Sequence, residues 1–558
     1  CFMQFVEHHY ARKLADYDAL YNWSINCRED FWDAIWRFFK IPNETDGETD
    51  GYRVLEPADV MFKANWFSGA KLNFAQNLLR FRDEHIALEF HNEKGHSVSL
   101  SYGDLYTQVA QLSAALKISG IGKGDRVAAI MPNIVQTVVA MLASTSLGAV
   151  WSCCSPEFGL QAMLDRFQQI QPKLLIFTDG YYYKGKSYKR LAVIKQLMAE
   201  LSSLQLKVLV PYLDKEDEFE EMQGDKVELF DDFKLSGCQD VALQNIVFEK
   251  TEFSHPLYIL YSSGTTGTPK CIVHGVGGTL LQHLKELSLH TDIKRSDKLF
   301  FYTSTGWMMW NWLISGLSLG ATLVLYDGSP FYPQAQSLLR LVDQQKITVF
   351  GCGAKYISTL HRQQTEINYA LKDLRLILST GSPLLAQSYD YVYQTIKSDV
   401  QLSSISGGTD IISCFALGNP LTPVYRGELQ GPGLGMAVEV WNEQGEALIQ
   451  QKGELVCTRS FPSMPIYFWN DPQHKKYHKA YFEKYSGLWA QGDYAELTAH
   501  QGLIIYGRSD ATLNPAGIRI GTAEIYRQLE NNASIVDSVV VGQRWKGDQR
   551  IILFVQLV

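Results

Sequence analysis

Short apolar runs rich in β-forming residues alternate with amphipathic stretches through most of this 558-residue chain. Arg126–Ile130 (RVAAI) is typical of a buried strand, Ile134–Leu147 of a helix, and Val150–Ser152 of the next strand. This alternation is typical of helices that connect the strands of a parallel sheet, so the sequence predicts a layered α/β fold. The same strand pattern recurs at Leu174–Phe177, Lys207–Val210, Thr322–Leu325 and Leu374–Leu378.

The pattern changes after Val424, where closely spaced glycines separate short alternating segments such as Val438–Trp441 and Glu454–Cys457. These segments predict a small β-rich, antiparallel subdomain over about 424–506. The chain is longer than one hydrophobic core usually serves, so we expect at least two domains. We assign 1–506 to a large N-terminal domain and 507–558 to the start of a small α+β C-terminal domain.

Composition and charge exclude several classes of protein. The formal net charge is −8, and no Lys/Arg run is long enough to form a basic face for nucleic acid. The most apolar region, Val127–Trp151, is interrupted by Pro132 and several polar residues, so we expect no membrane span. The nine cysteines are scattered without zinc-type spacing, which favours reduced thiols and a cytoplasmic location. No obligate protein partner is evident.

The strongest local signal is a turn of small and hydroxyl-bearing residues, Tyr261–Lys270 (YSSGTTGTPK), which follows the apolar run Leu257–Leu260. Its glycines let the backbone approach a ligand, and its hydroxyls and backbone N–H groups can surround phosphate oxygens. Lys270 adds a positive charge for the β- and γ-phosphates. The glycine spacing is not that of a Walker A loop. A surface linker is the alternative, but a linker rarely ends in Pro-Lys and re-enters a strand such as Cys271–His274.

As a whole string, this turn resembles the signature of the adenylate-forming superfamily of acyl-CoA synthetases, luciferases and peptide-synthetase adenylation domains. The resemblance covers nearly the whole chain. It implies ATP-dependent activation of a carboxylic acid as an acyl-adenylate and transfer of the acyl group to coenzyme A, with Mg²⁺ as a further cofactor. The other matching motifs, in the family's order, are Ser406–Asp410 (SGGTD), Gly492–Tyr494 (GDY), Gly507–Asp510 (GRSD) and Asn514–Ile525 (NPAGIRIGTAEI).

The resemblance also implies the residues that act on the reacting groups. A carboxylate that attacks the α-phosphate brings two anions together, so the site must neutralise charge. Asp410 and Thr266 are the implied Mg²⁺ ligands. Lys270 and Arg519 complete the implied catalytic set. Taken alone, Asp410 is equally compatible with a turn or a helix cap, and Arg519 with a surface charge.

A nucleotide site is implied in the same way. Asp493 is expected to accept hydrogen bonds from the ribose hydroxyls, and the loop Gly381–Pro383 to lie on the adenine. Taken alone, Asp493 also suits a turn, and Arg508 a surface charge. The full set expected to contact ATP or AMP is Ser262, Ser263, Gly264, Thr265, Thr266, Gly267, Lys270, Gly381, Ser382, Pro383, Ser406, Gly408, Thr409, Asp493, Arg508 and Arg519.

The acyl pocket of the family is lined from the region after Tyr302. Trp307–Trp312 (WMMWNW) can supply apolar walls there, although the pattern alone is more typical of a core helix. In members that act on acetate, a bulky Trp closes the pocket at the position that matches Gly407. We therefore expect room for a longer acid beside Gly407, and we expect Gly407→Trp to shift the preference towards acetate. The implied pocket residues are Trp307, Met308, Trp310, Asn311 and Gly407.

Four longer segments narrow the substrate. Trp66–Leu78, His283–Leu287, Leu378–Leu384 and Phe461–Trp469 resemble those of family members that activate acetoacetate. A site that hydrogen-bonds the extra carbonyl oxygen of a β-keto acid would reject butyrate more sharply than size alone. The donor is not identified; Trp310 and Asn311 are candidates. The alternatives are a ligase for another short acid such as butyrate, a nucleotide-binding protein without turnover, and a module that loads a carrier protein.

The last expectation concerns the C-terminal domain. The resemblance implies that the C-terminal domain rotates between the two half-reactions about a hinge at Asp510. The family also uses a Lys on a glycine-rich loop near the C-terminus, and no such loop occurs before Val558. Because the chain starts at Cys1 rather than Met, we expect that the mobile C-terminal domain is incomplete here and that both ends lack residues.

Overall fold

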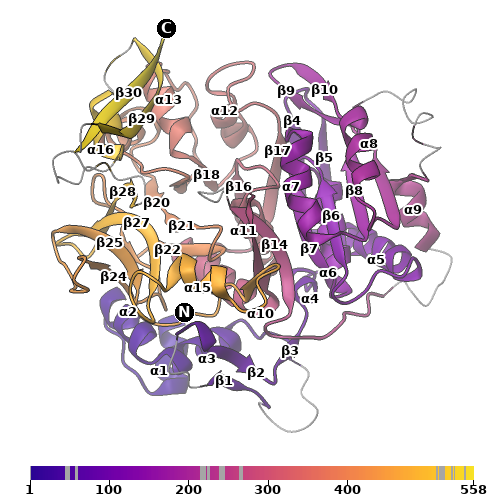
Figure 1. Cartoon of the computed structure of the whole chain (residues 1–558), viewed down its shortest axis with the longest axis horizontal. Coiled ribbons are helices and arrows are strands. Elements are labelled where there is room, and N and C mark those ends of the chain that lie inside the picture. The colour runs from indigo at the N-terminus through magenta and orange to yellow at the C-terminus, as the bar shows by residue number, and fades with distance from the viewer. Residues whose placement is uncertain are drawn as a thin grey trace.

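The structure is a computed structural model that describes residues 2–43, 51–56, 61–213, 222, 226–237, 245–262, 268–509, 513, 522–529, 532, 534–545 and 548–558. Two large sheets with helices on their faces make up most of the fold (Figure 1). This architecture confirms the layered α/β fold expected from the alternation of strands and helices.

The first sheet has eight strands and is parallel except at its last two pairings. Its antiparallel pair β14 and β15 flanks the phosphate turn predicted from the sequence. In spatial order the strands are β12 (Glu228–Leu229), β11 (Leu206–Val210), β8 (Leu174–Thr178), β6 (Arg126–Ile130), β7 (Val150–Cys154), β14 (Pro256–Ser262), β15 (Lys270–Gly275) and β26 (Tyr467–Phe468).

The second sheet has seven strands, and only its edge pair β4–β5 is antiparallel. The carboxyl ends of its parallel strands lie at one edge, where the loop Gly381–Pro383 follows β19 and the motif Ser406–Asp410 follows β20. In spatial order the strands are β20 (Gln401–Ser404), β19 (Leu376–Thr380), β18 (Val349–Gly353), β16 (Lys298–Phe301), β17 (Thr322–Asp327), β4 (Ile86–Asn92) and β5 (Ser97–Ser101).

Alternate residues of the strands face different hydrophobic cores. Val127 and Ala129 of β6 belong to the central core between the sheets, whereas Ala128 and Ile130 face an outer core. The central core contains helices α4 (Phe74–Leu78), α5 (Tyr102–Ile118), α6 (Val135–Ser146) and α10 (Val276–Lys285). The outer cores contain α7 (Leu160–Ile170) and α8 (Leu191–Glu200) on the first sheet, and α12 (Ser337–Gln344), α13 (Ala354–Arg362) and α14 (Ala386–Tyr391) on the second.

Antiparallel structure occurs in the region where the sequence predicts it, after Val424. A four-stranded sheet and a helix lie within 424–508, beside a three-stranded sheet whose first two strands precede Val424. Strand β28 continues to Arg508, two residues past the predicted boundary at 506. The elements are β24 (Val438–Trp441), β25 (Lys452–Cys457), β27 (Trp489–Leu497), β28 (Leu503–Arg508), α15 (Lys475–Tyr481), β21 (Ser406–Gly408), β22 (Ser413–Leu417) and β23 (Gly431–Pro432). The division into domains stays a prediction, and the hinge residue Asp510 lies outside the described residues.

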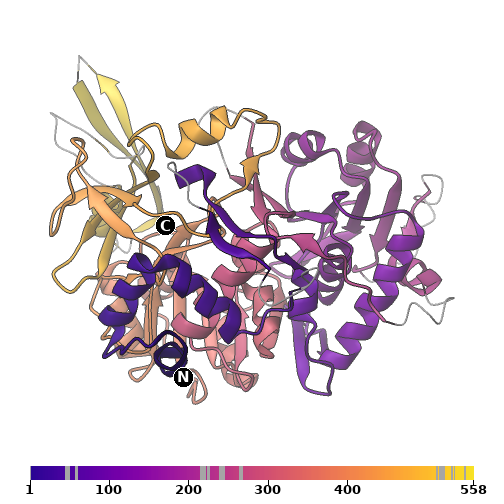
Figure 2. The same ribbon diagram turned by 90° about the horizontal axis from the view of Figure 1, so that it is seen from below.

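The N-terminal helices α1 (Phe2–Tyr10), α2 (Tyr17–Asn26) and α3 (Arg28–Phe38) lie against the later part of the chain (Figure 2). Hydroxyls on α2 make this contact, since Tyr17 donates to the Pro432 carbonyl at 3.2 Å and Tyr21 to the Met436 carbonyl at 3.0 Å. No helix in the described ranges is long and apolar enough to cross a bilayer.

The last described elements are α16 (Thr522–Leu529) and the hairpin β29 (Ile535–Trp545) and β30 (Asp548–Leu557). The hairpin contacts α13, where Lys355 Nζ lies 2.9 Å from Asp537 Oδ1. The remaining elements are η1 (Met61–Lys63), α9 (Phe230–Ser236), α11 (Met308–Ile314), η6 (Glu286–His290), η7 (Ser315–Leu319), η8 (Val392–Ile396), β1 (Arg53–Glu56), β2 (Asn65–Ser68), β3 (Lys71–Leu72), β9 (Gly180–Tyr183), β10 (Lys186–Lys189) and β13 (Thr251–Glu252).

Candidate active site

A cavity of about 340 Å³ lies where the second sheet meets the antiparallel subdomain. Its walls come from the carboxyl ends of β19 and β20, the first turn of α11, and strands β21, β22, β27 and β28. Parallel sheets bind ligands at this edge. The sequence-assigned residues that line the cavity are Trp307, Met308, Gly381, Ser382, Pro383, Ser406, Gly407, Gly408, Thr409, Asp410, Asp493 and Arg508.

Lys270 and Asp410 lie together, with Lys270 Nζ 3.9 Å from Asp410 Oδ1. Lys270 is the first residue of β15 and pairs with Ser262, the last residue of β14, so two strands fix the ends of the phosphate turn. The ammonium also lies 5.6 Å from the ring centre of Tyr481. The turn residues Ser263, Gly264, Thr265, Thr266 and Gly267, and also Arg519, lie outside the described residues.

Tyr481 holds the Asp410 carboxylate, because its hydroxyl donates to Asp410 Oδ1. Burial, followed by the charge of Asp410, raises the pKa of Tyr481 well above its ordinary value, so the hydroxyl keeps its proton. The Tyr481 ring stacks on Trp489 with centroids 3.9 Å apart. Sequence reasoning missed Tyr481, which lies on α15 and outside every motif.

The position of Asp410 fits a magnesium ligand. Mg²⁺ is usually held by one or two protein carboxylates together with substrate phosphates. Asp410 lines the cavity, and the side chain is 18% exposed, beside a lysine that can contact the same phosphates. A contribution from Thr266 stays a prediction.

Asp493 and Arg508 form an ion pair in the wall that β27 and β28 provide. The register of β27 and β28 places them side by side, with Arg508 Nη1 3.1 Å from Asp493 Oδ1. Burial raises the pKa of Asp493 to about 7, and the charge of Arg508 opposes this rise. A side chain on Gly492 would lie 2.5 Å from the Arg508 guanidinium, and its φ is +80°, so this position requires glycine.

The loop after β19 closes the cavity above Trp307. Gly381 has a φ of +86°, and a Cβ atom there would lie 3.6 Å from the Trp307 ring. Gly381 and Ser382 are exposed to the cavity, which leaves a flat backbone surface beside the indole. Such a surface can lie against a planar base.

Two residues assigned to the acyl pocket do not line this cavity. Trp310 and Asn311 are buried, and the Trp310 indole donates to Asn133 Oδ1 at 2.9 Å. An α-helix turns about 100° per residue, so Trp310 points away from Met308, whereas Asn311 follows Met308 by almost one turn and is buried without lining the cavity. Neither side chain is placed to bind the keto group in this cavity.

Gly407 lines the cavity through its backbone, but our expectation about its side-chain direction is wrong. A Cβ atom at Gly407 would lie 1.9 Å from the Ser413 carbonyl oxygen and 2.6 Å from Cys414 Cα. The missing side chain therefore points into β22 rather than into open space. An indole at this position cannot enter the cavity unless β21 separates from β22.

Other cavity residues were not assigned individually, and those on β22, β27 and β28 belong to no motif. Met309 follows Met308 on α11, and Thr380 ends β19, so each adjoins an assigned residue. The neighbours of the motif on β22 and β27 have no sequence signal of their own. The missed residues that line the cavity include Met309, Thr380, Ser413, Cys414, Gln491, Ile504 and Ile505.

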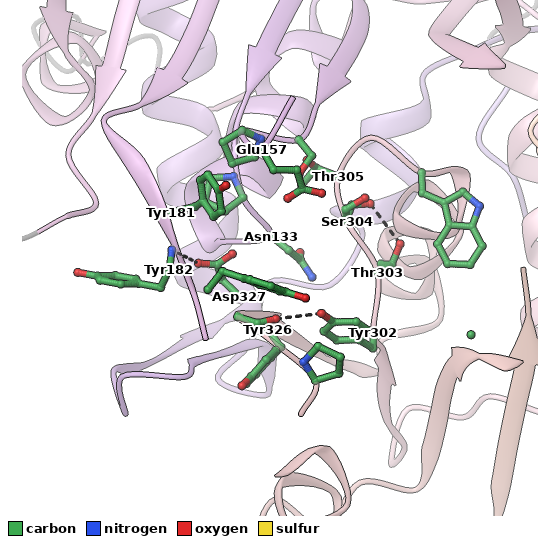
Figure 3. Close-up of a pocket in the computed structure, with 18 of the residues that line it drawn as sticks. Asn133, Glu157, Tyr181, Tyr182, Tyr302, Thr303, Ser304, Thr305, Tyr326 and Asp327 are labelled. Carbon is green, nitrogen blue, oxygen red and sulfur yellow. Dashed lines mark hydrogen bonds between the residues drawn. The ribbon is translucent and has the colours of Figure 1, made fainter. Parts of the chain in front are cut away.

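A second cavity of about 570 Å³ shares Trp307 with the first. It lies at the carboxyl ends of the adjacent pairs β6/β8 and β16/β18, where the strand order of each sheet reverses. Such switch points are the usual ligand sites of parallel sheets. Figure 3 shows Tyr181 and Tyr182 on one side of this space and Thr303 and Ser304 on the other.

A buried carboxylate forms part of the wall of the second cavity. Burial raises the pKa of Asp327 to about 7, and a hydrogen bond from the Tyr212 hydroxyl, 2.8 Å away, opposes this rise. Glu157 and Lys355 add further polar groups to the lining, and Asn133 lies between the two sides (Figure 3). The cavity is therefore suited to a ligand with both apolar and amide-like parts.

Comparisons with known proteins agree with this geometry. The model of the AMP-binding enzyme family matches residues 74–468, and that of the acetyl-coenzyme A synthetase N-terminus matches residues 17–78. Together they cover the phosphate turn, the second motif and helices α2 and α3.

Similar proteins match over almost the whole chain. An acetoacetyl-coenzyme A synthetase from Rhizobium meliloti is 50% identical over 100% of this chain and 84% of its own length. An acetoacetyl-CoA synthetase from Mus musculus is 46% identical over 98% of this chain and 81% of its own length. A malonamoyl-CoA synthetase from Penicillium aethiopicum is 39% identical over 100% of this chain and 79% of its own length.

A solved structure agrees as well. The acetoacetyl-CoA synthetase from Streptomyces lividans superimposes with a TM-score of 0.92 and 40% identity, covering 100% of this chain and 84% of that one. With the ordered motifs and the cavity that they line, these matches show that the chain belongs to the AMP-binding enzyme family, in its acetoacetyl-CoA synthetase branch.

Proposed function

We propose that this protein ligates acetoacetate to coenzyme A at the expense of ATP, through an acetoacetyl-adenylate, giving acetoacetyl-CoA, AMP and diphosphate. The observation that carries the proposal is the cavity in which residues from three separated motifs meet the loop Gly381–Pro383. The names of the similar proteins from Rhizobium, mouse and Streptomyces support acetoacetate as the acid.

In the first half-reaction, a carboxylate oxygen of the acid bonds to the α-phosphorus and diphosphate leaves. Lys270 provides positive charge at the phosphates, and Asp410 would hold Mg²⁺, which supplies further charge neutralisation when bound. Asp493 and Arg508 line the cavity and are expected to contact the ribose, and the Gly381–Pro383 loop is expected to lie against the base. The roles of Thr266 and Arg519 stay predictions.

In the second half-reaction, the CoA thiol attacks the acyl carbonyl, loses its proton, and AMP leaves with the electrons of the cleaved acyl–phosphate bond. We infer that the thiol arrives through the second cavity, because Trp307 lines both spaces. The pantetheine arm carries amides along a narrow chain, which suits a lining of tyrosines, amide and carboxylate groups.

The acid is expected to carry a carbonyl at its β-position. Acetoacetate and malonamate, the acyl groups named in the similar proteins, share this group. A site that hydrogen-bonds the β-oxygen discriminates against butyrate by leaving a buried polar group unpaired. This feature favours a β-carbonyl acid over the plain short-chain acids that we retain as the alternative.

The test is an acid panel with ATP, Mg²⁺ and CoA. We expect kcat/KM for acetoacetate to exceed that for butyrate by more than about 100-fold, because polar-group discrimination exceeds that of size. Product analysis should find acetoacetyl-CoA and AMP in equal amounts. A preference for butyrate would contradict the proposal, and nucleotide binding without any AMP release would favour the non-catalytic alternative.

Nucleotide binding should depend on pH through Asp493. Only the ionised carboxylate accepts hydrogen bonds from both ribose hydroxyls, and its pKa in the free protein is about 7. Binding therefore releases a proton near neutral pH, and AMP affinity should rise between pH 6 and pH 8 and then level off. Calorimetry in buffers of different ionisation enthalpy would detect the proton. The Asp493→Asn variant should bind AMP more weakly, and its AMP affinity should not depend on pH. If the affinity of the variant still depends on pH, another group is responsible for the effect.

The cytoplasm is the compartment we propose. Cysteines at 27, 153, 154, 271, 352, 414 and 457 carry free thiols. Such thiols persist in a reducing environment, where ATP and CoA are also available. Small molecules, rather than nucleic acid or another protein, are the proposed partners.

A further inference from the structure

We propose that Glu286 is a positioning residue that joins the two walls of the acyl end of the cavity and so determines which acid is accepted. The inference rests on the acid-activating function proposed above. Glu286 lies in the segment His283–Leu287 and begins η6, a π-helical turn that continues α10. Its side chain is fully buried. Such π-turns are frequent at functional sites.

The Glu286 carboxylate accepts hydrogen bonds from both walls. Oε1 accepts from the Ser413 hydroxyl and, at 3.0 Å, from the Cys414 backbone N–H; both residues lie on β22 and line the cavity. Oε2 accepts at 2.9 Å from Nε1 of Trp312 on α11, the helix whose first turn lines the opposite wall. One carboxylate thus spans the two elements between which the acid must fit.

Two neighbours on α10 make related bonds: Gln282 bonds to β22, and His283 bridges two residues that do not line the cavity. Gln282 Nε2 donates to the Ser413 hydroxyl at 2.7 Å. The His283 ring bridges the Ser315 hydroxyl and the Ile412 carbonyl, each at 2.7 Å. Burial lowers the pKa of His283 to about 4, so the ring is neutral at physiological pH. The walls are therefore tied by directional bonds, with Glu286 as the member that contacts both.

A buried cation accompanies the carboxylate. Lys285 Nζ lies 3.5 Å from Glu286 Oε1, and both side chains are fully buried. Removing one partner of such a pair leaves the other charge uncompensated, so a single substitution changes stability as well as geometry. A test must therefore separate the effect on acid preference from the effect on folding.

The measured quantity is the ratio of kcat/KM for acetoacetate to that for pentanoate, a longer acid without the β-oxygen. Glu286→Gln should lower this ratio about tenfold. Walls that are no longer held together distinguish the two acids less well, and the selectivity lost should equal at least that contributed by one methylene group. The KM for ATP should stay within about twofold of the native value. Trp312→Phe breaks the bond to Oε2, keeps an aromatic ring and leaves a smaller side chain in the core; it should lower the ratio about threefold.

Asp297→Asn is the matched control. Asp297 is a buried carboxylate that accepts from Thr348 Oγ1 at 2.7 Å and from Arg375 Nη2 at 2.8 Å, at the amino end of β16, away from the cavity. The Asp297→Asn variant should have a lower melting temperature than the native protein and an unchanged ratio of kcat/KM for acetoacetate to that for pentanoate. If Glu286→Gln does not fold, the ratio measured for Trp312→Phe tests the role of Glu286 instead.

Two results would overturn the role of Glu286: an unchanged ratio in the folded variants, or an equal loss of kcat/KM for every acid. The native enzyme is assayed first with the same acids. Failure of the native enzyme to use acetoacetate would count against the proposed function. Native activity combined with unaltered preference in the variants would count against Glu286 alone.

Discussion

Replacing Lys270 with Met is expected to slow adenylate formation by about two to three orders of magnitude, the usual cost of removing one preorganised charge-stabilising group. The ammonium lies 3.9 Å from Asp410 Oδ1, at the end of the turn that the sequence assigns to the phosphates. Methionine keeps the length and apolar contacts of the side chain and removes only the charge. Asp410→Asn should give a loss of similar size, since an amide is a poor magnesium ligand.

The measurement is acetoacetate-dependent exchange between ATP and diphosphate, which reports the first half-reaction alone. Lys298→Met is the matched control, because Lys298 pairs with Glu89 at 2.6 Å at the amino end of β16. It should keep the native exchange rate. Exchange by Lys270→Met within about fivefold of native would show that the turn does not contact the phosphates in the transition state.

A substitution at Tyr481 also tests the role assigned to Asp410. Its hydroxyl is the group that orients Asp410, so Tyr481→Phe should reduce exchange far less than Asp410→Asn does. The phenylalanine ring keeps the stack on Trp489, so the fold should be little affected. A loss equal to that of Asp410→Asn would mean that the hydroxyl itself contacts the reacting groups.

Local sequence patterns predicted the strands and motif positions well, because both depend on residues close together in the chain. Arg126–Ile130 and Val438–Trp441 have the predicted bounds in β6 and β24. The strand expected at Leu374–Leu378 lies instead at Leu376–Thr380, because β19 ends where its pairing with β18 and β20 ends.

Features that depend on distant contacts could not be predicted. Glu286 and Tyr481 act on the cavity from helices far from its motifs, and their role exists only once the sheets have packed. Trp310 and Asn311 do not line this cavity, and an apolar run does not reveal which helix face meets a cavity, so their assignment to the acyl pocket stays a prediction. The direction of a side chain at Gly407 depends on the irregular pairing of β21 with β22, which no sequence pattern encodes.

Gly407→Trp is now expected to disrupt the protein rather than to convert it to an acetate enzyme. The first side-chain atom would lie 1.9 Å from the Ser413 carbonyl oxygen, a backbone atom that cannot move without breaking the β21–β22 pairing. Even Gly407→Ala should lower the free energy of unfolding by about 3 kcal/mol, at the upper end for overpacking. Activity with every acid should fall together, because Ser413 and Cys414 line the cavity.

Gly408→Ala is the matched control for this prediction. A Cβ atom at Gly408 would lie 3.3 Å from the end of the Gln491 side chain, which can shift, and 3.5 Å from Asp410 Oδ2, an ordinary contact distance. The Gly408→Ala variant should have a melting temperature within a few degrees of that of the native protein, whereas that of Gly407→Ala should be well below it. If Gly407→Trp instead folds normally and prefers acetate, then β21 lies differently when substrate is bound, and the acyl end of the cavity is on the other side of Gly407.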